Sequence, residues 1–288
     1  MSRRKTYLGL AIFGMLIAAI LGYILIATFR VSKLPDIEQT NQEPTTHQQT
    51  SDSEPELPEP THFNAHVLQQ TIDDWVTNHA GTYGIVVQDP RTKDTLATYN
   101  QHQTFFTASL YKLYMAFLVW QDLDSGDIEE QANFYEQYSL NDCLDRMIRL
   151  SDSPCGEAVL AAYDYASVQK RLLALGMPDI NMPGFQVSAA DMAVLLQHIY
   201  DHQLIPETSA QSLRQSMREQ IYDKGLKSGF NMYLVEDKVG FSENGDWHDV
   251  GLVKVGDDYL IVAVLSNKAY SANLAGLATS LQNTLESL

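Results

Sequence analysis

The feature of this sequence that most constrains its fold is a long helical stretch between two groups of strand patterns. Residues 109–213 carry successive helical patterns with short connections. A helical segment and two strand patterns precede the stretch, and three strand patterns and an amphipathic helix follow it. The order predicts an α+β domain, an α/β sandwich whose antiparallel sheet is interrupted by a helical insertion. The expected strands are residues 83–89, 94–100, 233–242, 247–255 and 259–267.

Two segments of different composition precede this domain. Residues 7–29 contain no charged side chain and, at about 1.5 Å per residue, are long enough to cross a hydrocarbon core of about 30 Å. Residues 30–60 are rich in Pro, Gln and Glu and predict a disordered tether. The remaining residues, 61–288, have the length and composition of one globular domain.

The ends of the apolar segment predict how it is oriented. Basic residues lie in residues 1–6, so this end is expected in the cytoplasm. The apolar run is longer than a usual signal-peptide core, and no A-x-A-like cleavage site follows it. We therefore expect an uncleaved, single-pass anchor in the plasma membrane, with the globular domain outside the cytoplasm, and keep a cleaved signal peptide as the alternative.

Charge and spacing exclude several functions. The formal net charge of −17 argues against a nucleic-acid partner, which needs clustered Lys and Arg. His198 and His202 are four residues apart but lack a third ligand nearby, so we expect no metal, and no cofactor motif is present. Cys143 and Cys155 flank a short turn, and we favour two buried free thiols over a disulfide.

The helix that begins at Ser109 carries the clearest chemical signal. It is apolar on nearly all sides, which is typical of a buried helix, yet it contains Lys112. Burial disfavours a charged ammonium and lowers its pKa, which makes Lys112 a candidate general base. Ser109 lies three residues earlier on the same face, at the helix start, and is a candidate nucleophile. The alternative is a capping serine with a lysine that reaches solvent.

Three short motifs resemble the signatures of the class A β-lactamase and D,D-peptidase superfamily, which read S-x-x-K, S-D-N and K-T-G in this order. They are Ser109-Leu-Tyr-Lys112, Ser151-Asp-Ser153 and Lys238-Val239-Gly240. The resemblance extends over residues 61–288. It implies an α/β sandwich and an enzyme that acylates its own serine with a peptidoglycan stem peptide or a β-lactam.

The resemblance also implies a role for each matching residue. Ser109 would be the acylated nucleophile and Lys112 its proton acceptor, and Ser151 would pass a proton to the leaving nitrogen. Lys238 would hold the substrate carboxylate. The backbone N–H groups of Ser109 and Phe241 would form the oxyanion hole. The substrate-binding positions are therefore Ser153, Val239, Gly240 and Phe241.

The motifs depart from the family pattern at three places. Ser153 stands where the family has Asn, and Val239 stands where it has Thr. Residues 176–188 contain no Glu to activate a deacylating water, only Asp179. A D,D-peptidase-like enzyme is therefore our first interpretation. A β-lactamase with another base, such as Asp179 or Glu157, and a catalytically silent domain that binds cell-wall peptides are the alternatives.

Overall fold

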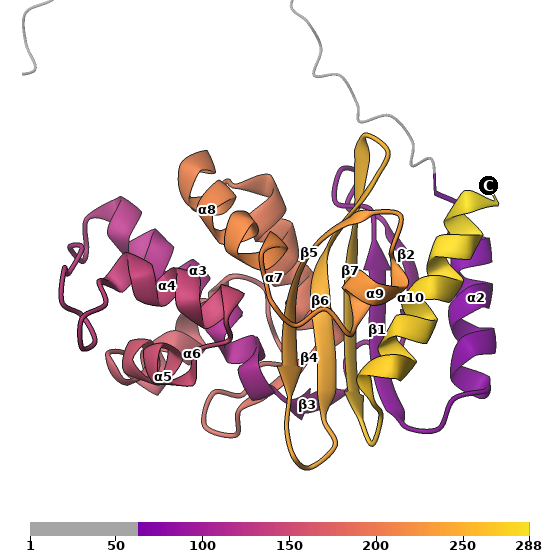
Figure 1. The fold of residues 1–288 in the computed structure, drawn as a ribbon, viewed down its shortest axis with the longest axis horizontal. Helices are drawn as coiled ribbons and strands as arrows, with labels where there is room; N and C mark the ends of the chain where they lie inside the picture. The colour runs from indigo at the N-terminus through magenta and orange to yellow at the C-terminus, as the bar shows by residue number, and fades with distance from the viewer. Residues whose placement is uncertain (1–62, 288) are drawn as a thin grey trace, which may run out of the picture. The chain divides into compact units, whose positions relative to one another are not determined.

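The computed structural model describes residues 63–287, which form a five-stranded antiparallel sheet with helices on both faces (Figure 1). The expected anchor at residues 7–29 and the tether at 30–60 lie outside these residues. Within residues 63–287, no helix is both long and apolar enough to span a membrane. The predicted α+β fold and the interruption of the sheet by helices are confirmed.

The sheet has the order β2-β1-β7-β6-β5, so the strands from the two ends of the domain meet in its middle. β1 pairs with β7 along its whole length, and β5 forms one edge. β7 is buried on both faces, which explains why its sequence is a continuous apolar run. The bounds of the five strands are Thr82–Gln88 (β1), Thr95–Tyr99 (β2), Leu234–Phe241 (β5), Trp247–Val255 (β6) and Asp258–Asn267 (β7).

Two long helices, α2 (Ala65–Thr77) and α10 (Ser271–Glu286), cover one face of the sheet together with the short helix α9 (Leu226–Gly229) (Figure 1). The sheet separates two hydrophobic cores, and alternate residues of β7 point into different ones. Val262 packs in the core with the terminal helices, and Ile261 packs in the core of the helical block. The helices of the block and of the segment after it are α3 (Tyr111–Ser125), α4 (Leu140–Arg149), α5 (Ser153–Ala161), α6 (Tyr165–Ala174), α7 (Ala189–Asp201), α8 (Glu207–Arg218) and α9 (Leu226–Gly229).

Two local features differ from the sequence expectation. Strands β3 (Thr104–Phe106) and β4 (Gln186–Ser188) pair in a small second sheet that the sequence did not predict. A 3₁₀ turn (Ala108–Leu110) contains Ser109, and the α-helix proper begins only at Tyr111. Both features lie next to Ser109, where the chain turns from the small sheet into the buried helix.

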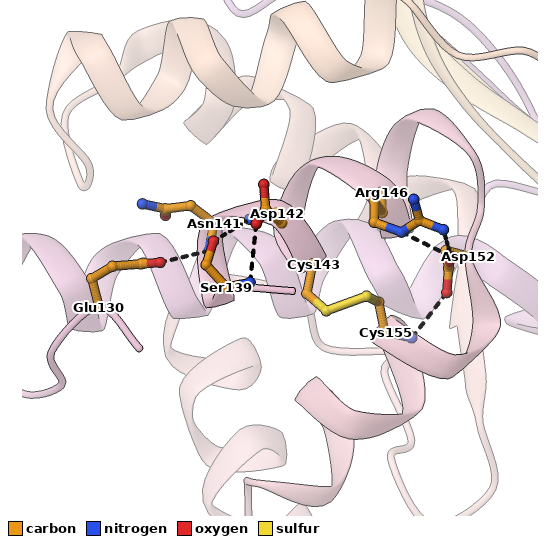
Figure 2. The surroundings of a disulfide bond; sticks show 8 residues. All are labelled: Glu130, Ser139, Asn141, Asp142, Cys143, Arg146, Asp152 and Cys155. Atoms are coloured by element: carbon orange, nitrogen blue, oxygen red, sulfur yellow. Dashed lines mark hydrogen bonds and ion pairs between the residues drawn. A yellow bond between two sulfur atoms is a disulfide. The ribbon is translucent and has the colours of Figure 1, made fainter. Parts of the chain in front are cut away.

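A disulfide joins α4 to α5, which corrects our preference for two free thiols. Cys143 and Cys155 are bonded, with their Cα atoms 5.0 Å apart (Figure 2). Cysteines at this separation are within disulfide reach, and the turn between the two helices brings them together. The turn is further fixed by Asp152, which accepts a hydrogen bond from Cys155 N (3.0 Å) and pairs with Arg146 (2.5 Å) (Figure 2).

Candidate active site

Ser109 and Lys112 face each other at the start of α3. Lys112 Nζ donates a hydrogen bond to Ser109 Oγ at 3.1 Å, and the lysine side chain is only 1% exposed. Burial lowers the pKa of Lys112 to about 8, although the carboxylates of Asp152 and Glu157 raise it in part. Lys112 therefore has a sizeable neutral fraction near neutral pH and is within reach of the proton on Ser109, as general base catalysis requires.

The Ser151 turn supplies the second wall of the site. Lys112 Nζ also donates to the Ser151 carbonyl (2.7 Å) and to Ser153 Oγ (3.3 Å). Ser151 has a positive φ of 54°, an unfavourable conformation for a residue with a side chain, which costs about 1–3 kcal/mol. The disulfide and the Asp152 contacts hold the backbone beside it in place. In this conformation the Ser151 carbonyl points toward Lys112 and the Ser151 hydroxyl points toward Lys238.

Lys238 approaches Ser151 from strand β5. Its Nζ donates to Ser151 Oγ (3.0 Å) and to the Val239 carbonyl (2.7 Å). Complete burial, together with the nearby positive charge of Lys112, lowers the pKa of Lys238 to about 7, although the carboxylates of Asp237 and Asp249 raise it in part. Two lysines with lowered pKa values thus flank one serine, an arrangement typical of a catalytic site.

Two buried carboxyl groups lie on the opposite side of β5 and β6. Asp237 forms an ion pair with Lys227 (2.7 Å), and Asp249 accepts a hydrogen bond from Leu226 N (2.6 Å). Burial raises the pKa of both groups, most strongly for Asp249, which also faces the Asp237 carboxylate. The nearby ammonium of Lys227 lowers both pKa values in part, and it forms the ion pair with Asp237.

Gly240 allows β5 to lie against the nucleophile turn. A Cβ atom at this position would lie 3.2 Å from the backbone nitrogens of Ser109 and Leu110, so a larger residue would push the turn away. In β5 the backbone groups of alternate residues point to the same side. Val239 N points to the open edge, where Gln220 accepts from it, and Phe241 N therefore points to that edge as well. This direction suits an oxyanion-hole donor.

The side chains of the predicted substrate-binding residues differ in their access to solvent. Ser153 is exposed, and Phe241 is 42% exposed and stacks on Trp247. Val239 is 1% exposed, so its side chain is covered by protein and only its backbone borders the edge. Sequence reasoning missed Gln220, whose side-chain amide contacts β5 on either side of Lys238, because no local pattern marks it.

The two candidate acids for deacylation occupy different surroundings. Asp179 Oδ2 is bound to His102 Nδ1 (2.8 Å) and Ser188 Oγ (2.9 Å), which fixes the segment before α7. Glu157 lies on α5, one residue after Gly156, where a Cβ atom would be 2.8 Å from Lys112 Cε. The negative charge of Glu157 contributes to the raised pKa of Tyr111 beside it. Of the two acids, Glu157 is the one whose charge also raises the pKa of Lys112 in part.

The histidine pair considered for a metal has other contacts. His198 Nε2 lies 2.9 Å from the Leu175 carbonyl oxygen, and His202 ends α7 in a left-handed conformation. In the described part of the chain, no group of three or more His, Cys, Asp and Glu side chains is placed to hold a metal ion. The site is built from serine and lysine side chains and backbone N–H groups.

Comparison with known proteins identifies the family. The sequence model of the "Beta-lactamase enzyme family" matches residues 67–281. The chain belongs to this family. No curated protein sequence matches significantly. The predicted membership of the serine β-lactamase and penicillin-binding superfamily is thereby confirmed.

Solved structures of the family have the same fold. A class A β-lactamase from Bacteroides cellulosilyticus superposes with a TM-score of 0.69 at 18% identity, covering 79% of this chain and 100% of that one. PBP-A superposes with a TM-score of 0.67 at 18% identity, covering 77% and 96%. A β-lactamase from Xanthomonas campestris gives 0.68 at 16% identity, covering 77% and 98%. At such identities the likeness establishes the fold alone.

The lowered pKa of Lys112 predicts the pH dependence of acylation. Below its pKa of about 8, the neutral fraction of Lys112 rises about tenfold for each pH unit, so the acylation rate should rise equally and level off above pH 8. Stopped-flow measurement with a chromogenic cephalosporin at pH 5.5–9.5 tests this, with circular dichroism confirming the fold at each pH. A flat profile between pH 6 and 8 would contradict the role of Lys112.

Proposed function

We propose that this protein is a serine acyl-transfer enzyme that forms an acyl-enzyme on Ser109 with D-Ala-D-Ala peptides or β-lactams. The observation that carries the proposal is the 3.1 Å hydrogen bond between Ser109 and a buried lysine whose pKa is lowered to about 8. The alternative, in which Ser109 only caps the helix and Lys112 reaches solvent, does not agree with the burial of Lys112. Membership of the β-lactamase family supports the same class of chemistry.

The proposed acylation step uses the contacts described above. Lys112 accepts the Ser109 proton while Oγ bonds to the substrate carbonyl carbon, and the N–H groups of Ser109 and Phe241 stabilise the negative oxygen. The carbon–nitrogen bond then breaks, and the leaving nitrogen takes a proton from the Ser151 hydroxyl. Lys238, whose Nζ donates to Ser151 Oγ, returns a proton to Ser151. Lys112 keeps the proton taken from Ser109, so the lysine pair gains one proton and loses one, and the net transfer is from Ser109 to the leaving nitrogen.

The departures from the family motifs affect substrate binding more than the acylation machinery. Ser153 contributes its hydroxyl to Lys112, at 3.3 Å, where the family Asn holds substrate. Val239 offers no hydroxyl, so recognition of a carboxylate falls to Lys238. We therefore propose a D,D-peptidase-like activity with modest substrate affinity. Hydrolysis of β-lactams is the second candidate, favoured by the position of Glu157 beside Gly156 and Lys112.

We propose further that residues 7–29 anchor the enzyme in the plasma membrane, with its catalytic domain outside the cytoplasm. The support is the uncharged apolar run and the basic residues before it. The full-length protein should fractionate with membranes, retain its N-terminus, and be cleaved in the 30–60 segment by protease added outside the cell. Mature protein that starts after Phe29 would overturn this.

The first test of the activity is covalent labelling by a penicillin. The domain should gain the mass of one opened β-lactam on Ser109, and Ser109→Ala should abolish the adduct. Lys112→Ala should slow acylation about 10²–10⁴-fold, because a positioned base commonly contributes that much. Intact-mass spectrometry with peptide mapping provides the measurement, and Ser125→Ala is a matched control distant in sequence. No adduct at any penicillin concentration would instead support a silent binding domain.

The second test concerns the fate of the acyl-enzyme. Asp179 is bound to His102 and Ser188, and residues 176–188 supply no other acid, so we expect deacylation to be slow and the adduct to persist for minutes or longer. Burst kinetics with a chromogenic cephalosporin should show one equivalent of product followed by near-silence. Steady turnover at about ten per second or more, abolished by Glu157→Gln but not by Asp179→Asn, would establish a β-lactamase with Glu157 as its base.

A further inference from the structure

Strand β5 has an open edge, and a side chain occupies part of it. β5 is the last strand of the sheet, so its outward backbone groups have no strand partner. Gln220 Nε2 donates to the Asp237 carbonyl (2.5 Å), and Val239 N donates to Gln220 Oε1 (3.0 Å). The single side-chain amide therefore contacts the edge as one peptide group of an added strand would.

Gln220 is fixed in this position from behind. Its side chain is 5% exposed, and its own carbonyl accepts a hydrogen bond from Lys227 Nζ (3.2 Å). Lys227 also donates to the Met217 carbonyl (3.0 Å) and forms an ion pair with Asp237 on β5. Lys227 thus holds the segment of Gln220 against β5. Moving the Gln220 side chain away would leave the Val239 N–H and the Asp237 carbonyl without partners, and a buried polar group without a partner costs free energy.

The backbone of Val239 on this edge is fully hydrogen-bonded within the protein. The Val239 carbonyl accepts from Lys238 Nζ at 2.7 Å, so both backbone polar groups of Val239 are satisfied. Phe241, two residues further along, is the next residue whose backbone points to the edge. A bound extended chain thus meets outward backbone groups at Phe241 and a blocked edge from Val239 onward.

The position of the blocked edge has a consequence that rests on the proposed function. The carbonyl under attack lies between Ser109 and the Phe241 N–H, and the leaving nitrogen lies toward Ser151. The leaving group therefore runs along the edge from Phe241 toward Lys238. A leaving group that ends before Val239, with its carboxylate directed toward Lys238, fits this space, whereas a longer chain continues into Gln220.

We propose that Gln220 is a specificity-determining residue that restricts the leaving group to a single residue with a free carboxylate. The enzyme then removes or displaces only the last residue of a peptide and does not cleave within a chain. Lys238 recognises the terminal carboxylate, and Gln220 excludes the peptide that would extend past it.

Two thioester donors with the same benzoyl-D-alanyl group test this proposal. One has mercaptoacetate as its leaving group, and the other has mercaptoacetyl-glycine, which is one residue longer. The wild-type enzyme should prefer the short donor by about tenfold or more in kcat/KM, measured by thiol release, because the longer one must displace a buried hydrogen-bonded amide. Gln220→Ala should reduce this preference to about threefold or less, mainly by accelerating the long donor.

Control variants separate specificity from stability. Gln215→Ala removes an exposed glutamine of α8, which ends just before Gln220; its side chain is bonded to Glu219, and the variant should keep the wild-type preference. Gln220→Glu retains an acceptor for Val239 N–H but cannot donate to Asp237, and should relax the preference partly. If the wild-type enzyme reacts equally with both donors, the role of Gln220 is overturned and the proposed function is not affected. Failure of both donors and of penicillin to acylate Ser109 overturns the proposed function itself.

Discussion

The site depends on the burial of two lysines around one serine. Lys112 and Lys238 both contact Ser151, one through its carbonyl and the other through its hydroxyl, and their pKa values are lowered to about 8 and about 7. Burial is the main cause at both lysines, and at Lys238 the positive charge of Lys112 adds to it. A group able to accept the Ser109 proton therefore arises from the burial of Lys112, without a histidine.

The rest of the fold keeps these groups in place. The disulfide and the Asp152 contacts stabilise the turn that holds Ser151 in a left-handed conformation, and the absence of a Cβ at Gly240 lets β5 reach the nucleophile turn. Behind β5, the carboxyl groups of Asp237 and Asp249 raise the pKa of Lys238 in part, but Asp237 forms its ion pair with Lys227. The Nζ of Lys238 is instead bonded to Ser151 and to the Val239 carbonyl.

The sequence predicted the parts of this arrangement that have a local signature. Hydrophobic periodicity located the five strands and the apolar helix with Lys112 inside it. The positive φ of Ser151 and the pairing of β3 with β4 depend on segments far apart in the chain, and so does the Gln220 contact with β5. The disulfide was misjudged because spacing alone does not show that α4 and α5 lie within bonding distance.

The pairing of β1 with β7 also determines when the domain can fold. β1 is made early in synthesis, but its partner ends at Asn267, and α10, which packs beside α2 on the same core, ends at Glu286. The central strand pair therefore closes a loop of most of the domain, and such long-range pairing is slow to form. A nascent chain thus exposes the apolar face of β1 until β7 and α10 have been made, and depends on protection from aggregation during this interval.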